Sequence, residues 1–387
     1  MSETDRELFM PAAFILFFLL AGFFSFLING LLLKFSSTLG NRQMQHRHTI
    51  RWSNNVKPSV GGFSFYILFL ISLSIYGIFN FSEQEYMSRH LLGMVASVTA
   101  GFLLGLADDA YNTIPLLKFF SQIFCGLSLV VTDTMIPATG IYYLDALITV
   151  IWVVGIMNSI NMLDNMDGIS GIVTLFLMLA CFLVLVAGEN IFSFYSIMLL
   201  GVSGAIIGFL YFNWHPARIY MGDTGSQFLG AFISAISIPL LWNFRSASGG
   251  TIQLTQYLIP LVAFTVPIMD TGTVLLRRIA RGRSPFIGGK DHITHHFVYA
   301  GLKDKHVIYL FGGWSFISAC LAAWLAAIRT ELNQAAIIAV YSYLILLFIG
   351  VQYFYNRGTM KENARISSGE HAKPGMKSSS HGHSATA

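Results

Sequence analysis

The sequence contains few charged residues and few cysteines for its length. Charged residues make up 11% of the 387 residues, whereas hydrophobic residues make up 55% and the mean hydropathy is +0.63. This balance excludes an ordinary soluble globular protein. Cys125, Cys181 and Cys320 lie in apolar runs without a CxxC pair, which excludes a disulfide framework or a cysteine-based zinc site. Long apolar runs instead predict an all-α, polytopic integral membrane protein.

A helix needs about 20 apolar residues to cross the hydrocarbon layer of a membrane. On that criterion we expect eleven transmembrane helices, near residues 10–33, 61–80, 91–107, 116–132, 145–163, 169–188, 191–212, 226–242, 254–276, 306–328 and 334–355. Residues 1–355 are therefore predicted to form one membrane-embedded domain. Residues 356–387 are predicted to form a polar, disordered cytoplasmic tail.

The distribution of Lys and Arg predicts the orientation. With the amino terminus outside, the inner segments hold 19 basic residues and the outer segments hold 4. Such an excess is expected on the cytoplasmic side. An odd number of spans then places the carboxyl terminus in the cytoplasm.

Every polar cluster falls at the inner end of an expected span. The longest closes the span near 145–163, where Asn158, Asn161, Asp164 and Asp167 recur every third residue before Gly168. On a helix the first three drift around one side and can point into one cavity. Each residue alone could cap a helix end, but ionisable groups gathered beside a membrane core indicate function.

Two more acidic motifs suit phosphate or metal chemistry. Asp108 and Asp109 close the span near 91–107, and such a pair suits a divalent metal, or one ligand and one general base. Two solvated acids at a helix end are the alternative. Asp223 lies between two glycines just before the span near 226–242, where it could hold Mg²⁺ while the backbone cradles a phosphate. A helix N-cap would explain that sequence equally well.

The basic loop from Arg277 to Phe297 contains His292, His295 and His296. Neither cysteine nor an HExxH helix accompanies these histidines, so we favour phosphate recognition over zinc binding. Part of the basic charge also fits an anchor on anionic lipid. Asp270 is expected to pair with a nearby polar group or Arg277, and Lys57 is available to a phosphate.

Together these motifs resemble those of the polyprenyl-phosphate N-acetylhexosamine-1-phosphate transferases. The resemblance runs from about Lys57 to Ala300, in the order PxxGG, DD, NxxNxxDxxDG, GDxGS and HxxHH. It implies that a polyprenyl phosphate attacks the β-phosphate of a UDP-sugar, which forms a polyprenyl diphospho-sugar and releases UMP. It also implies a requirement for Mg²⁺, with Mn²⁺ as an alternative.

The resemblance assigns roles to particular residues. The catalytic residues would be Asp108, which accepts the proton of the lipid phosphate, Asp109, which supports the site, and Asp164. Asp223 would be the principal Mg²⁺ ligand, with Asn161 sharing the ion. The substrate-binding set would comprise Lys118 at the lipid phosphate, Asp167, Asn213 and Tyr220 around the nucleotide, His292, His295 and His296 at the diphosphate or sugar, and Asn158.

Departures within the motifs favour the UDP-GlcNAc branch of this family. The muramoyl-pentapeptide branch carries a lysine three residues after the second Asp, an unbroken HHH and ten spans; this chain has Asn112, His-Ile-Thr-His-His and eleven expected spans. Lys118 lies nine residues after Asp109, as in the UDP-GlcNAc branch. Asn165 replaces a glycine of the family motif.

The expected protein is thus a transferase of the bacterial inner membrane that starts a cell-envelope glycan. Its partners would be a UDP-N-acetylhexosamine and a polyprenyl phosphate but no nucleic acid, and a homodimer is left open. Phospho-N-acetylmuramoyl-pentapeptide transfer, or transfer from another UDP-N-acetylhexosamine, is the alternative within the family. A CDP-alcohol phosphatidyltransferase would need an Ala-Arg soon after Asp167-Gly168, where this chain has Ile-Ser-Gly. A cation transporter would need acids near mid-span.

Overall fold

The structure, a computed structural model, describes residues 3–38, 57–80, 89–188, 191, 193–244, 254–280, 282, 292–328 and 334–368. These residues form α1 (Glu3–Thr38), α2 (Gly62–Asn80), α3 (Arg89–Tyr111), α4 (Pro115–Val131), α5 (Tyr142–Leu163), α6 (Ile169–Ala187), α7 (Phe194–Asn213), α8 (Gly222–Ser237), the π-helix η2 (Ile238–Trp242), α9 (Leu254–Ala263), α10 (Thr265–Ala280), α11 (Ile293–Tyr299), α12 (Asp304–Ile328) and α13 (Gln334–Ser367). Several basic residues used to predict the orientation, including Arg42, Arg47, Arg51 and Lys290, lie outside the described residues.

The described part of the chain contains helices and no strand; one isolated bridge joins Ser59 and Tyr220. Eight helices are long and apolar enough to cross a membrane. A bent pair, α9 with α10, would make a ninth span, and α2 and α4 are shorter apolar helices. The predicted all-α class is therefore confirmed for the described residues, and the apolar helices are consistent with a multi-pass membrane protein. Each of the eleven expected spans coincides with one of these elements, but their number and orientation remain predictions.

The bend between α9 and α10 measures 77°. Pro267 follows the break by one turn, and its nitrogen cannot donate a hydrogen bond to the carbonyl of Ala263, the last residue of α9. Pro260 lies one turn before the break. The bend thus follows directly from the positions of two prolines.

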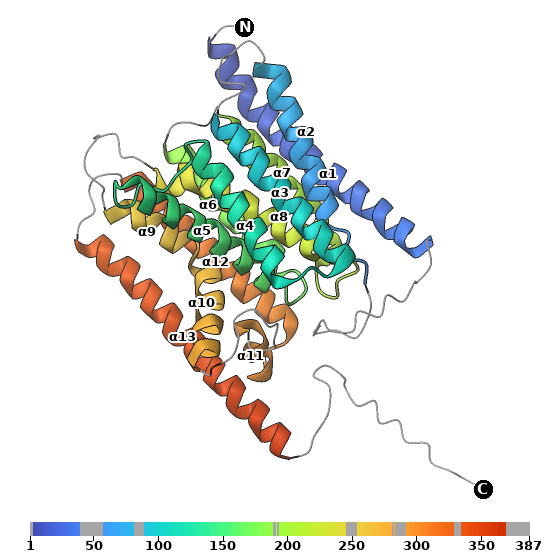
Figure 1. The fold of residues 1–387 in the computed structure, drawn as a ribbon, viewed down its shortest axis with the longest axis vertical. Helices are drawn as coiled ribbons and strands as arrows, with labels where there is room; N and C mark the ends of the chain where they lie inside the picture. Colours follow the sequence, from blue (N-terminus) through green and yellow to red (C-terminus); the bar gives the residue numbers. More distant parts are fainter. Residues whose placement is uncertain are drawn as a thin grey trace.

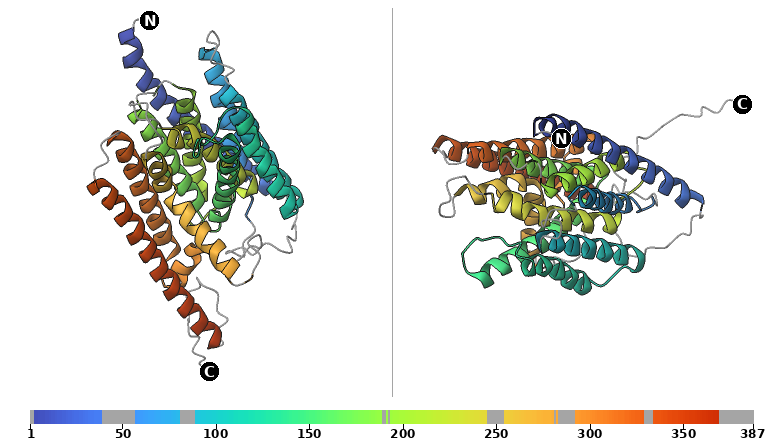
Figure 2. Two further views of the ribbon diagram at one scale, coloured as in Figure 1. Left: turned by 60° about the vertical axis from the view of Figure 1, so that its left-hand side comes forward. Right: turned by 90° about the horizontal axis from the view of Figure 1, so that it is seen from above.

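The helix at the centre of the bundle is α8 with its continuation η2. In the most apolar window of Gly222–Trp242, 94% of the residues are buried, compared with 11% for α1 and 22% for α13. Phe228 and Phe232 of α8 pack with Phe69 of α2. Figures 1 and 2 show α1 and α13 at the outside of the bundle. The polar residues at the amino end of α8 therefore lie next to the most buried part of the molecule.

Glycines let neighbouring helices approach the amino end of α8. A Cβ on Gly105 of α3 would overlap the backbone carbonyl of Asp223, and a Cβ on Gly62 would overlap the backbone of Gly225. Close approach through small residues is a common means of packing transmembrane helices. Here it brings the end of α3 and the start of α2 against the residue expected to bind metal.

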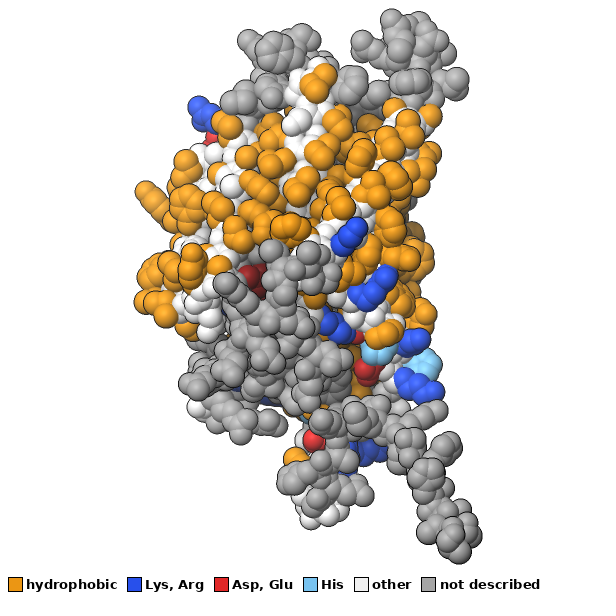
Figure 3. Space-filling model, turned by 90° about the vertical axis from the view of Figure 1, so that its right-hand side faces the viewer, with side chains coloured by type: hydrophobic (Ala, Val, Ile, Leu, Met, Phe, Trp, Pro, Cys, Tyr) orange, Lys and Arg blue, Asp and Glu red, His pale blue; other side chains and the backbone are white. Residues whose placement is uncertain are grey.

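The surface fits a membrane environment. Figure 3 shows a broad apolar face, with several Lys, Arg and His side chains gathered toward one end. Exposed apolar residues include Leu31, Phe120 and Leu346, which are 58–68% exposed. This face matches the apolar runs from which the spans were predicted.

The helix α13 continues to Ser367, whereas we expected the polar tail to begin at residue 356. The added turns pack against α11. A Cβ on Gly358 would overlap the backbone of His296, and Lys361 Nζ donates to the carbonyl of Ala300 at 2.8 Å. The boundary differs because these contacts hold a polar segment in helical form. The amino end of α1 and the carboxyl end of α13 lie at opposite ends of the bundle (Figure 1).

Candidate active site

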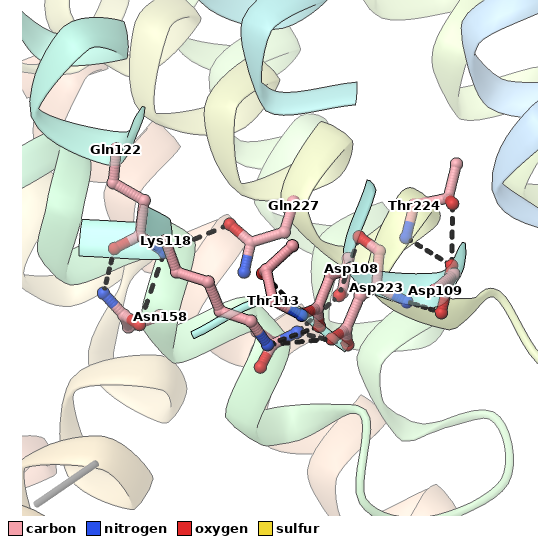
Figure 4. A network of polar contacts seen from close by, with 11 residues as sticks. Asp108, Asp109, Thr113, Lys118, Gln122, Asn158, Asp223, Thr224 and Gln227 are labelled. Carbon is pink, nitrogen blue, oxygen red and sulfur yellow. Dashed lines mark hydrogen bonds and ion pairs between the residues drawn. The ribbon is translucent and has the colours of Figure 1, made fainter. Parts of the chain in front are cut away.

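The predicted acids and amides meet where several helix ends converge. Hydrogen bonds and ion pairs join the carboxyl ends of α3 and α5 to the amino ends of α4 and α8. Figure 4 shows this network from close by. The expectation that distant motifs share one end of the bundle is therefore confirmed for these elements.

The Asp108 carboxylate is almost fully buried and has two different kinds of partner. Its Oδ1 accepts hydrogen bonds from Thr113 N at 2.9 Å and Thr113 Oγ1 at 2.7 Å. Its Oδ2 forms an ion pair with Lys118 Nζ. One oxygen is thus held by neutral donors, and the other faces a cation.

Asp223 repeats this arrangement on α8. Its Oδ1 accepts a hydrogen bond from Asn161 Nδ2 at 2.8 Å, and its Oδ2 lies 3.3 Å from Lys118 Nζ. Asn161 also donates to Ser226 Oγ at 2.8 Å. Lys118 therefore bridges Asp108 and Asp223, and its side chain is 29% exposed.

Asp109 points to different partners, as adjacent residues on a helix must. Its carboxylate accepts hydrogen bonds from the backbone of Asp223 at 3.1 Å, from the backbone of Thr224 at 2.8 Å and from Thr224 Oγ1 at 2.7 Å. It therefore caps the amino end of α8, where free N–H groups attract a carboxylate. This contact fixes the position of Asp223.

A layer of amides lies one helical turn deeper than the ionic residues. Gln122 Oε1 accepts a hydrogen bond from Asn158 at 2.7 Å, and Gln122 Nε2 donates to Gln227 Oε1 at 3.1 Å (Figure 4). Sequence reasoning found Asn158 but missed both glutamines. Their spacing was a usable signal, because Gln122 follows Lys118 by four residues and Gln227 follows Asp223 by four.

The loop after α5 is joined to the loop before α8. Asn213, which is 2% exposed, accepts a hydrogen bond from Gly168 N and donates one to the carbonyl of Ile219, both at 2.9 Å. Asp167 Oδ2 accepts from Ala217 N at 2.9 Å and lies 3.0 Å from His215 Nδ1. Both side chains thus shape the loops, and the nucleotide contacts expected for them remain a prediction.

Asp164 and Asn165 lie in the same loop. Asp164 follows the last residue of α5 and its side chain is half-buried. Asn165 replaces the family's glycine without a left-handed backbone: the described non-glycine residues with positive φ are Asn112 and Asp133. Instead Asn165 Oδ1 accepts a hydrogen bond from Thr294 Oγ1 at 2.8 Å. The substitution therefore connects this loop to the histidine helix α11.

Tyr220 pairs with the segment before α2. Its backbone N donates to the carbonyl of Pro58 at 2.9 Å, and its carbonyl accepts from Gly61 at 3.0 Å. Lys57 Nζ lies 5.2 Å from the centre of the Tyr220 ring. The PxxGG and GDxGS motifs are thus one structural unit that presents an aromatic ring and a cation together.

The three histidines are buried at α11 and contact different groups. His292 Nδ1 lies 3.1 Å from Asp270 Oδ2, and Asp270 Oδ1 accepts from the backbone of Ile293 at 3.0 Å. Asp270 thus pairs with a polar group, as expected. The ring of His295 lies edge-on to that of His292, with centroids 5.9 Å apart.

His296 faces α13. Its ring centroid lies 3.8 Å from that of Tyr355, and its Nδ1 lies 3.3 Å from Thr359 Oγ1. Burial and the Glu362 carboxylate raise the pKa of nearby Tyr299 to about 12. Contact of the three histidines with a diphosphate or sugar remains a prediction.

The donor set around Lys118 fits a hard divalent cation better than zinc. Within the described ranges no three His, Cys, Asp or Glu side chains are arranged as a metal cluster. Two carboxylate oxygens, from Asp108 and Asp223, already converge on one cationic atom. Mg²⁺ commonly binds one or two carboxylates together with phosphate oxygens of a substrate. The residues present therefore fit Mg²⁺ when a phosphate completes the ligand set.

Comparison with known proteins identifies the region that contains this network. Residues 91–241, from α3 to η2, match the family model described as glycosyl transferase family 4. In this region the chain is similar to glycosyl transferase family 4. The match confirms the resemblance seen in the motifs, and Asp108, Lys118, Asn161 and Asp223 all lie within the matched residues.

Curated proteins with similar sequences are named as sugar-phosphate transferases. A probable undecaprenyl-phosphate N-acetylglucosaminyl 1-phosphate transferase of Bacillus subtilis is 27% identical over 69% of this chain and 73% of its own length. A decaprenyl-phosphate N-acetylglucosaminephosphotransferase of Mycolicibacterium smegmatis is 28% identical over 44% of this chain and 43% of its own. A phospho-N-acetylmuramoyl-pentapeptide-transferase of Leptospira biflexa is 36% identical over 30% of this chain and 28% of its own. The chain spans less than half the length of the latter two. The glycosyl transferase family 4 match and these names indicate a sugar-phosphate transferase.

Proposed function

We propose that this protein transfers a sugar 1-phosphate, namely GlcNAc 1-phosphate, from a UDP-sugar to a polyprenyl phosphate, with Mg²⁺ as cofactor. A lipid phosphate oxygen would form a bond to the β-phosphorus of the donor. The bond from that phosphorus to the bridging oxygen would break, and UMP would leave with that oxygen. The observation that supports this best is the convergence of Asp108, Asp223 and Lys118 at one end of the bundle, inside the matched family region.

The proposed ligands of Mg²⁺ are Asp223 and, through its amide oxygen, Asn161. The bound ion would neutralise charge on the diphosphate, which is the main requirement of phosphoryl transfer. Asp109 holds the backbone of Asp223 and so orients its carboxylate. Lys118 would bind the lipid phosphate, since its side chain is partly exposed and its ammonium lies beside the carboxylates.

Asp108 is the proposed acceptor of the lipid phosphate proton. A phosphate monoester loses its second proton with a pKa of about 6, so much of the lipid phosphate needs no base at neutral pH. Thr113 donates two hydrogen bonds to one Asp108 oxygen, and the other oxygen faces Lys118, where the lipid phosphate is proposed to bind.

The donor end of the site would comprise Tyr220 with Lys57, the loop of Asp164 and Asp167, and the histidines of α11. A tyrosine ring can stack on uracil, and lysine and histidine can bind a diphosphate. The hydrogen bond from Thr294 to Asn165 supports this grouping, because it holds α11 beside the acidic loop.

Phospho-N-acetylmuramoyl-pentapeptide transfer is the second proposal, and a relative with that name supports it. Asn112 and the interrupted histidine motif favour an N-acetylhexosamine donor instead. A cation transporter is disfavoured, because Asp108 and Asp223 lie at helix ends. We further propose eleven spans, an outside amino terminus and a location in the bacterial inner membrane, with the site facing the cytoplasm.

The purified protein in detergent should form UMP when given a short-chain polyprenyl phosphate, Mg²⁺ and UDP-GlcNAc. A panel with UDP-GalNAc and UDP-N-acetylmuramoyl-pentapeptide would identify the donor. Asp223→Asn should lower the rate by about a hundredfold or more, as loss of a charge-stabilising group at a reaction centre does. Arg89→Gln, which removes a charge at an exposed surface pair, is the matched control. Absence of UMP with every donor would reject the proposal.

A further inference from the structure

We propose that the Lys118 ammonium is a placeholder cation, which neutralises Asp108 and Asp223 until a divalent ion displaces it toward a bound phosphate. The inference rests on the proposed function for the identity of the phosphate. It adds that the Lys118 side chain moves from the carboxylates of Asp108 and Asp223 to the phosphate when the substrate binds.

The two oxygens of each carboxylate have different partners. Neutral donors hold Oδ1 of each acid: Thr113 on Asp108, and Asn161 on Asp223. The Oδ2 atoms of both acids face Lys118 Nζ. The oxygens that no neutral donor holds are therefore those that face Lys118 (Figure 4).

Two cations cannot share these oxygens without strong repulsion. A divalent ion bound to Asp223 Oδ2 would lie close to the ammonium, at a site where both side chains are about two thirds buried and charge interactions are stronger than in bulk solvent. Entry of the ion therefore requires that Lys118 leave. Conversely, Lys118 lowers the affinity of the substrate-free protein for the ion.

The structure allows the side chain to leave while its helix stays in place. One turn deeper, Gln122 is hydrogen-bonded to α5 through Asn158 and to α8 through Gln227. These interhelical bonds hold α4 in register. Lys118 has a flexible four-carbon stem and its side chain is partly exposed, so its ammonium can swing to an anion nearby.

This exchange makes ion and phosphate binding cooperative. A phosphate that accepts the Lys118 ammonium frees the carboxylates for the ion, and by linkage the ion raises the affinity for the phosphate by the same factor. Lys118 would thereby prevent tight binding of the divalent ion until the phosphate is also present.

The first test needs no substrate. Mn²⁺ binding to the purified protein is titrated by electron paramagnetic resonance for the wild type, Lys118→Gln, Lys118→Arg and Arg89→Gln. Lys118→Gln should bind Mn²⁺ about tenfold more tightly than the wild type. Lys118→Arg retains the cation, and Arg89→Gln removes one from an exposed pair at the other end of α3, so neither should gain affinity.

Equal or weaker Mn²⁺ binding by Lys118→Gln would overturn the proposal. The gain must also disappear in Lys118→Gln with Asp223→Asn; if it persists, the ion binds elsewhere and the proposal fails. Removal of Lys118 leaves the Asp108 and Asp223 carboxylates without their cation, so an ion that binds between them should stabilise the fold. Thermal unfolding therefore provides a second readout. Mn²⁺ should raise the melting temperature of Lys118→Gln more than that of the wild type, and an equal or smaller rise counts against the exchange.

The second test measures cooperativity. A short-chain polyprenyl phosphate should raise the Mn²⁺ affinity of the wild type and of Arg89→Gln, with a smaller rise in Lys118→Gln. An equal rise in all three, or none in the wild type, would refute the exchange. A wild type that forms no UMP would reject the proposed function, yet the substrate-free comparison of Lys118→Gln with the wild type would still decide the placeholder role.

Discussion

Two adjacent carboxylates have different tasks at the end of α3. Side chains one residue apart on a helix point about 100° apart, so Asp108 and Asp109 cannot face the same group. Asp108 faces Lys118, whereas Asp109 binds the backbone at the start of α8. The pair thus combines a reactive carboxylate with one that fixes the neighbouring helix, and each role can be tested separately.

Asp109→Ala should lower the free energy of unfolding by about 1–2 kcal/mol, the usual cost of removing a helix cap. The Asp223 and Thr224 N–H groups would lose their acceptor. Chemical denaturation in detergent would measure the change. Asp133→Asn, at a side chain that is 61% exposed, should change stability much less. A fully stable but inactive Asp109→Ala would contradict the capping role and favour a direct catalytic one.

Asp108→Asn should reduce activity more at low pH than at high pH. Below about pH 6 the lipid phosphate carries a proton that a base must remove, whereas at pH 8 it is mostly the dianion. The ratio of wild-type to Asp108→Asn UMP formation should therefore fall as the pH rises from 5.5 to 8. A ratio that does not change with pH would indicate that Asp108 acts only on Lys118.

At the scale of elements, α13 supports the histidine helix. Arg277 of α10 lies 3.2 Å from the centre of the Tyr355 ring and donates to Gln352 at 2.6 Å. The same ring contacts His296, and the backbones of α13 and α11 meet at Gly358. Three elements thus position one imidazole. The carboxyl end of α13 is therefore part of the folded domain.

Gly358→Leu should reduce activity about tenfold or more, because the new side chain would displace the His296 backbone. Gly350→Leu is the matched control, since a Cβ at Gly350 meets no atom within 4 Å. Rates of UMP formation compare the two variants. Mn²⁺ binding should be unchanged in both, because α13 does not contact Asp223 in the hydrogen-bond network. Similar activity of the two variants would exclude a positioning role for α13.

At the scale of the whole molecule, the polar site occupies one end of an otherwise apolar bundle. The loop of Lys303 lies at this end, just before α12, whose Ile308 packs near Gly168. Asp133 pairs with Arg89, the first residue of α3, and so lies at the opposite end. This polarity places the chemistry at one face of the membrane.

The proposed orientation predicts which end is accessible from outside the cell. In a Cys320→Ala background, Asp133→Cys should react with a membrane-impermeant maleimide on intact cells. Lys303→Cys should react only after the membrane is disrupted. The remaining Cys125 and Cys181 are buried and should stay unlabelled. The opposite labelling pattern would show that the site faces outward.

Much of the fold could be predicted because its determinants are local. Apolar runs predicted each of the long apolar elements, and the ordered motifs predicted Asp108, Asn161 and Asp223, which meet at the ends of α3, α5 and α8. The boundary at residue 356 was wrong because it rested on composition, whereas the end of α13 depends on its contact with α11. The bend between α9 and α10 could have been inferred from Pro267.

By itself, the sequence determined that this is a helical membrane protein whose polar motifs lie at span ends, since hydropathy, length and spacing act within short segments. The tertiary structure decided the partners: Lys118 with two carboxylates, Asp109 with a helix end, Gln122 with Asn158 and Gln227, and Asp270 with His292. The partners come from different elements of the chain, and on a helix a rotation of 100° per residue decides which side chains face one another. Those rotations are fixed only when the helices pack.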